Sequence, residues 1–96
     1  MLIKPEEING IIRKAGEKVA AKGKSYYEQD KITIKKATYI SDEKFRVQTF
    51  VKGNYIYEPF ICRDKGILRF ACNCPTFSEK KRVCKHIVAT AFDMYV

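Results

Sequence analysis

The spacing of apolar residues changes period twice along the chain. Near the N-terminus apolar residues recur every three or four positions, which predicts an amphipathic helix from Pro5 to about Ala21. Its apolar positions are Ile8, Ile11, Ile12, Ala15 and Val19. A proline followed by two acids is typical of a helix start. Gly23 should interrupt this helix, and residues 25–29 should add one further turn.

From residue 31 onward the period shortens to two, as in half-buried β-strands. Four such segments follow one another, at residues 31–40, 44–52, 55–63 and 67–72. The connectors are short and contain turn residues, so neighbouring strands should pair as antiparallel hairpins. Pro59 has no backbone N–H, which places its strand at an edge or marks a bulge.

After His86 the period lengthens again and predicts a C-terminal helix. Its apolar stripe comprises Val88, Ala91, Phe92 and Tyr95. The helix should reach Val96 without a stop signal, and we therefore expect the natural polypeptide to continue. The whole pattern predicts an α+β fold. An N-terminal helix packs on a four-stranded antiparallel meander, which a loop connects to the C-terminal helix.

Composition bounds the class of protein. The chain has 96 residues, 46% hydrophobic and 31% charged, which fits one globular domain small enough to profit from a metal staple. No apolar run is long enough to span a membrane, and Met1–Pro5 lacks the features of a signal peptide, so we expect a cytoplasmic location. The formal charge of +8 favours anionic partners, nucleic acid foremost. The alternative is that the charged residues only keep the surface solvated.

Three of the four cysteines and the only histidine fall within residues 72–86. Cys72 and Cys74 form one close pair, and Cys84 and His86 form another beyond a polar, basic loop. In an extended strand alternate side chains point the same way, so the first pair can reach one ion. The second pair can converge if Cys84 lies on a turn that enters a helix, with His86 at or just inside that helix. Because Cys₃His is a standard closed set for structural zinc, we predict one Zn²⁺ that staples this loop.

The sequence leaves other roles open for the cysteines. A thiol cluster without metal is one alternative, and a Cys₄ set with Cys62 in place of His86 is another. We expect Cys62 to act as a small core residue instead. Thiol–disulfide exchange or acyl transfer would need an accessible cysteine, whereas a closed four-ligand site leaves no open position. The sequence also has no Walker-type phosphate loop, and its scattered acids form no pair that suits general acid–base catalysis, so we predict that this chain is not an enzyme by itself.

The order Cys-x-Cys, variable loop, Cys-x-His resembles the SWIM-type zinc finger. Cys72, Cys74, Cys84 and His86 occupy the four ligand positions of that pattern. The flanks Cys-Pro-x-Phe and Cys-Lys-His-Ile-Val-Ala also look typical of the family. The resemblance implies zinc as the cofactor and a single SWIM-type domain over residues 1–96, with its zinc motif at residues 72–86.

A looser similarity concerns residues 15–27, which are similar to a segment found upstream of the motif in bacterial SWIM proteins. Those proteins frequently form the N-terminal part of SWI/SNF-type ATPases and helicases. The similarity therefore implies a longer polypeptide, whose other domains would be natural partners of this one.

Two functions follow from the resemblance, because SWIM fingers are expected to bind either nucleic acid or protein. Lys80, Lys81 and Arg82 lie in the loop between the ligand pairs, and Lys85 lies within the second pair. Such cations suit contacts with a phosphate backbone. We therefore predict a structural-zinc module for DNA binding, in an accessory region of a helicase or ATPase. The alternative is a protein–protein or intramolecular docking module, favoured by the apolar C-terminal helix and the aromatic-rich strands.

Overall fold

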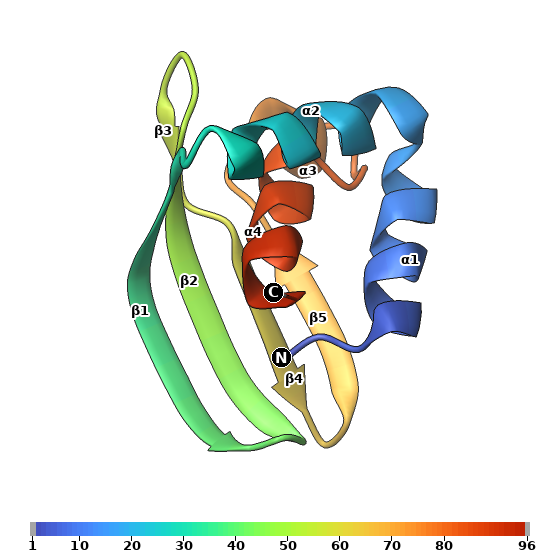
Figure 1. Ribbon diagram of the computed structural model, residues 1–96, viewed down its shortest axis with the longest axis vertical. Helices are drawn as coiled ribbons and strands as arrows, with labels where there is room; N and C mark the ends of the chain where they lie inside the picture. Colours follow the sequence, from blue (N-terminus) through green and yellow to red (C-terminus); the bar gives the residue numbers. More distant parts are fainter. Residues whose placement is uncertain (1, 96) are drawn as a thin grey trace.

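The structure is a computed structural model that describes residues 2–95. The helices lie together on one side of an antiparallel sheet (Figure 1). The helices are α1 (Pro5–Ala15), α2 (Glu17–Glu28), α3 (Pro75–Ser78) and α4 (Lys85–Tyr95). The strands are β1 (Ile32–Ser41), β2 (Lys44–Lys52), β3 (Ile56–Tyr57), β4 (Phe60–Asp64) and β5 (Ile67–Ala71). The predicted α+β class, meander and C-terminal helix are confirmed, whereas the predicted end at Val96 lies outside the described residues.

The N-terminal region forms two helices rather than one. Gly16 separates them with a φ of +88°, a conformation that costs a glycine little and other residues much. Its N–H closes α1 on the carbonyl of Ile12 at 3.0 Å, and its own carbonyl accepts the N–H of Ala20 at 2.9 Å. The predicted continuous helix to Ala21 and the predicted break at Gly23 are therefore wrong, because α2 runs straight through Gly23.

The sheet has the strand order β1-β2-β4-β5, with β3 paired to the end of β2. The predicted third strand splits at Pro59 into β3 and β4. Pro59 is fully buried, and its carbonyl accepts the N–H of Thr49 at 3.1 Å. Because β4 lies between β2 and β5, the strand that follows Pro59 is not an edge strand, and that alternative is wrong. The proline instead marks the interruption between β3 and β4.

Helix α4 lies at the centre of the core, against α1, α2 and the inner face of the sheet (Figure 1). Ile87, Val88, Ala89 and Ala91 have no exposed surface. The helix is therefore buried on more sides than the single apolar stripe predicted. Such a helix cannot leave without uncovering the sheet, so α4 couples the metal-ligand region to the rest of the fold.

One buried cation joins α1 to the sheet. Arg63 of β4 is only 5% exposed and pairs with Glu7 of α1. Its second terminal nitrogen donates to the carbonyl of Asp42, in the turn between β1 and β2, at 2.7 Å. The guanidinium also lies over the ring of Phe45, 5.0 Å from the centroid. A buried charge persists only when it is paired and hydrogen-bonded, and Arg63 meets both conditions.

Candidate metal centre

Two short segments, residues 72–74 and 84–86, converge to form the metal centre. Cys72 follows the last residue of β5, and Cys74 is the residue before α3. Cys84 directly precedes α4, and its carbonyl accepts the N–H of Val88 at 3.2 Å, as the residue that caps a helix does. His86 is the second residue of α4. The predicted placement of Cys84 and His86 is confirmed, with the helix starting at Lys85.

The ligand atoms of the two pairs meet in a closed cluster. One ligand atom from each of Cys72, Cys74, Cys84 and His86 lies within 4.8 Å of all the others. The Sγ of Cys72 is 3.8 Å from Nδ1 of His86, which identifies Nδ1 as the nitrogen that faces the thiols. Ligands about 2.3 Å from one tetrahedral ion lie roughly 3.8 Å apart, so the cluster has the size for zinc. The four side chains are buried, with residue exposures of 7, 2, 1 and 3%, and the cysteines are free thiols.

The surroundings lower the pKa of one ligand thiol and raise the pKa of the other two. The neighbouring Cys72 thiol, as hydrogen-bond donor, lowers the pKa of Cys84 to about 4, and the N–H of Ile87 at the start of α4 acts in the same direction. The same hydrogen bond, together with burial, raises the pKa of Cys72. Burial is also the main reason that the pKa of Cys74 is raised. Cys84 is thus the most acidic of the three thiols, and three cysteines with one histidine are a donor set that fits Zn²⁺.

Packing fixes the imidazole of His86. The ring of Tyr57 lies with its centroid 4.3 Å away, and that of Tyr26 lies 6.0 Å away. Nε2 is buried and has no hydrogen-bond partner among the protein groups of residues 2–95. One turn later, Thr90 donates to the carbonyl of His86 at 2.9 Å, and its hydroxyl lies 2.9 Å from that of Thr49 in β2. The ligand helix is therefore tied to the central sheet. Sequence reasoning missed Tyr57, because nothing in its strand pattern distinguishes it from other tyrosines.

The loop between the ligand pairs is folded and exposes its cations. The N–H of Lys81 donates to the carbonyl of Phe77 at 3.1 Å, and that of Arg82 to the carbonyl of Thr76 at 3.2 Å. The side chain of Phe77 packs against the core. Lys80, Lys81 and Arg82 are all exposed. The three cations, which we name the loop cations, are therefore presented to solvent by a short segment that is held at both ends.

Lys85 does not belong with the loop cations. Its side chain is half-buried, and its Nζ lies 5.5 Å from the ring centroid of Tyr26. A cation over an aromatic face is partly satisfied by the protein itself. The structure thus brings the four metal ligands together and leaves Lys85 beside them, packed on α2.

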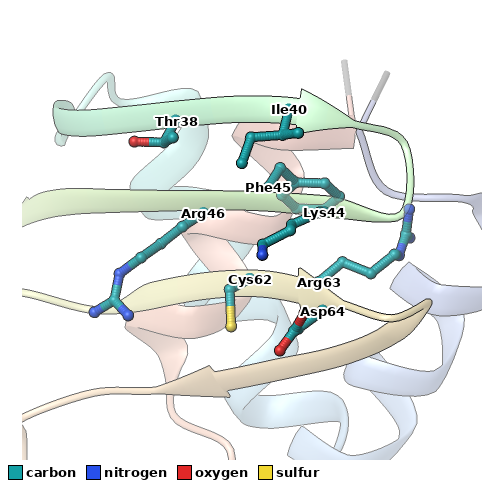
Figure 2. Close-up of a pocket in the computed structure, with 8 residues that line it drawn as sticks. All are labelled: Thr38, Ile40, Lys44, Phe45, Arg46, Cys62, Arg63 and Asp64. Carbon is teal, nitrogen blue, oxygen red and sulfur yellow. The ribbon is translucent and has the colours of Figure 1, made fainter.

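Cys62 lies away from the metal centre. It is half-buried in β4, where its register partners are Arg46 of β2 and Arg69 of β5. Figure 2 shows its thiol on the open side of the sheet, with the helices behind the strands. The expectation that Cys62 is a core residue is wrong, because its position in the strand alternates with the buried Ile61 and Arg63. The same alternation excludes it from a Cys₄ site.

Comparison with known families identifies the fold of the metal centre. Residues 57–94, from the end of β3 into α4, match the SWIM zinc finger family. This part of the chain is a SWIM zinc finger. All four clustered ligands fall inside the matched range, and the predicted SWIM finger and its zinc cofactor are confirmed. Comparisons with curated proteins and with solved structures gave no match. The two strands β1 and β2 and the helices α1 and α2 lie outside the matched SWIM segment.

Thiol reactivity should separate the SWIM ligands from Cys62. Zinc-loaded protein should react with a thiol reagent at one cysteine per chain, and all four should react after chelation and denaturation, because zinc and burial protect three thiols. The measurement is a colorimetric thiol count beside elemental analysis, which should give one zinc per chain. Cys62→Ser is the control and should abolish the reaction of the loaded protein. Reaction of three or more cysteines while zinc is bound would contradict the assignment of ligands.

Proposed function

We propose that this SWIM domain is a structural-zinc module that binds nucleic acid, DNA in particular. The observation that carries the proposal is the position of the loop cations, Lys80, Lys81 and Arg82, exposed between two pairs of buried metal ligands. Because the zinc ligands hold both ends of the loop, the cations meet a phosphate backbone with little further loss of chain entropy. Phosphate contacts of this kind give binding without sequence preference.

Charge supports the same proposal. The formal charge is +8, and three thiolates with one Zn²⁺ change it by −1, which leaves +7. A domain of this size with such an excess attracts polyanions over a distance set by the ionic strength. A four-ligand site has no open position for substrate, so the module serves another activity rather than performing one. We propose that this activity is that of an ATPase or helicase on the same polypeptide, in the cytoplasm. Within residues 2–95, every helix is too short or too polar to cross a membrane.

The second candidate function is docking of protein, either a separate partner or another domain of the polypeptide. Its support is the exposure of apolar residues on both faces of β1, where Ile34, Tyr39 and Ile40 are 55, 58 and 66% exposed. Strand β1 pairs only with β2, so one of its edges has no strand partner within the described part of the chain. The apolar helix α4 no longer favours docking, since the core buries it.

The loop cations should control DNA affinity and its salt dependence. The triple variant Lys80→Ala, Lys81→Ala, Arg82→Ala should bind duplex DNA more weakly than the parent. The slope of log affinity against log salt should fall by roughly 0.9 for each phosphate that the variant no longer neutralises. Fluorescence anisotropy of a labelled mixed-sequence duplex, measured from about 50 to 200 mM salt, gives both quantities.

A matched control removes the same charge elsewhere. Lys18, Lys22 and Lys24 are exposed on α2, and changing all three to Ala lowers the net charge equally without touching the zinc loop. This control should keep the parent's salt slope, and all variants should keep one zinc per chain. If the loop variant binds like the parent at low salt, the loop is not the contact surface, and docking becomes the leading function.

A further inference from the structure

Within residues 2–95 the helices all lie on one face of the sheet, and we name the opposite face the outer face (Figure 1). Strand β2 shows the division most clearly. Its residues Phe45, Val47, Thr49 and Val51 are buried beneath the helices. The residues between them are more exposed and face the other way: Lys44, Arg46, Gln48, Phe50 and Lys52. The outer face of β2 is thus mainly basic, polar and aromatic.

Three shallow hollows follow one another along the outer face of β1 and β2. The first, of about 270 Å³, is lined by Lys31, Thr33, Phe50, Lys52 and Ile56. The second, of about 390 Å³, is lined by Lys36, Thr38, Arg46 and Gln48. The third, of about 230 Å³, shares Thr38 and Arg46 with the second and extends to Lys44, Cys62 and Asp64 (Figure 2). They form a track along β2, whose nine residues span roughly 30 Å.

The charge of this track is strongly one-sided. Four exposed cations line it: Lys36, Lys44, Arg46 and Lys52. The half-buried Lys31 also lines it, but its Nζ lies 5.0 Å from the ring centroid of Tyr26 and is partly satisfied there. Asp64, at one end, is the exposed acid that lines it. Lys35 lies nearby but is already paired with Glu58 at 2.6 Å. A row of cations at strand spacing is complementary to the regular negative charges of a nucleic-acid backbone.

Aromatic rings lie between these cations. Phe50 is half-buried on the outer face of β2, with Nζ of Lys35 5.2 Å from its centroid. The guanidinium of Arg46 lies 4.3 Å from the centroid of Phe60, which is diagonal to it on β4 and pairs with Gln48 in the register. A guanidinium stacked on one ring offers its other face to a base and its N–H groups to phosphate. Such an arrangement suits a single strand, because its unpaired bases can stack on the rings while its phosphates contact the cations. Bases inside a duplex are already stacked and have no free face for a ring.

We infer that the outer face of β1 and β2 binds single-stranded nucleic acid. The backbone lies along the cations Lys52, Lys36, Arg46 and Lys44, and bases contact Phe50 and the Arg46–Phe60 pair. This inference rests on the proposed function and assigns it a second, larger surface with a preference for single strands. The surface is formed by strands outside the SWIM match, so the zinc finger and the track cooperate as separate contacts.

The decisive experiment compares a single strand with its duplex on the same variants. The outer-face variant Lys36→Ala, Arg46→Ala, Lys52→Ala should bind a labelled mixed-sequence single strand at least about tenfold more weakly at about 50 mM salt. Its salt slope should fall by about 0.7 for each phosphate no longer neutralised. Phe50→Leu keeps an apolar side chain but removes the ring. It should weaken single-strand binding by roughly fivefold or more and leave duplex binding unchanged.

The loop variant and the α2 control distinguish this inference from the proposed function. If the zinc-loaded parent binds neither single strand nor duplex, the proposed function is wrong and the inference fails with it. If the parent binds and the loop variant loses binding, while the outer-face variant matches the α2 control, nucleic-acid binding stands and the outer face is not its surface. If Phe50→Leu weakens both nucleic acids equally or neither, the single-strand preference is wrong.

Alkylation of Cys62 provides a second test, which does not require a variant with altered charge. Its thiol lies on the outer face, in the hollow that also holds Arg46 (Figure 2). A saturating single strand should slow alkylation of Cys62 in the zinc-loaded protein severalfold, since it covers that hollow. A duplex held by the zinc loop should leave the rate unchanged. An alkylation rate that the bound single strand does not alter would overturn the inference even if the variants fold poorly.

Discussion

Removing zinc should unfold most of this domain, including strands that lie far from the metal in the sequence. The reason is the place of α4, which carries His86 in its first turn and fills the core with Ile87, Val88 and Ala91. If the first turn loosens, the inner face of β2 and β4 loses its cover. Structural zinc contributes roughly 10–16 kcal/mol of apparent binding free energy in zinc-finger peptides, which is as large as the roughly 5–15 kcal/mol stability of most domains.

Hydrogen exchange of the zinc-loaded and chelated protein measures this directly. The amides of Val47 in β2 and Ile61 in β4 are the reporters, since both residues are buried against the helices and are paired in the sheet. They should lose protection together with α4 on chelation, and also in Cys74→Ser, which removes one ligand. Cys62→Ser is the control and should keep full protection, because this thiol is not a ligand. Sheet amides that stay protected without zinc would show that the core folds independently of the metal.

The sequence predicted the metal centre well because its determinants are local. Each pair of ligands is separated by a single residue, and an extended strand or a helix entrance fixes how such a pair points. Cys72, Cys74, Cys84 and His86 could therefore be assigned without knowing the path of the loop between them. The strands were predicted for a similar reason, since alternation over residues 44–52 matches β2 along its whole length.

The predictions that proved wrong concern properties that depend on how helices and strands pack against one another. Both Gly16 and Gly23 weaken a helix, and propensity does not say which of them ends it. The structure gives Gly16 the positive φ and buries Gly23 inside α2. Cys62 was placed in the core because its residue type is usually buried, whereas the pairing of β4 turns it to the outer face. The burial of α4 on several sides likewise depends on two packing helices and a sheet, which no single window of sequence contains.

Gly23→Ala should destabilise the domain and weaken zinc binding, although alanine favours helices. A Cβ added at Gly23 would lie 2.6 Å from both Cβ and Cγ1 of Val88 and 2.8 Å from the carbonyl oxygen of Lys85. These atoms belong to α4, so α2 and α4 must move apart. Overpacking of this kind costs roughly 1–3 kcal/mol or more, against the gain of about 1 kcal/mol from helix propensity. Because Lys85 lies between Cys84 and His86, the shift also displaces metal ligands.

Gly10→Ala provides the matched control, since Gly10 is also inside a helix and an added Cβ there meets nothing within 4 Å. That variant should gain up to about 1 kcal/mol, whereas Gly23→Ala should lose stability, so the two changes differ in sign. Urea unfolding of the zinc-loaded proteins measures the stabilities, and competition with a coloured chelator measures zinc affinity. If Gly23→Ala is as stable as Gly10→Ala and holds zinc as tightly as the parent, α2 and α4 can separate at Gly23 without strain. The coupling of their packing to the metal centre would then be wrong.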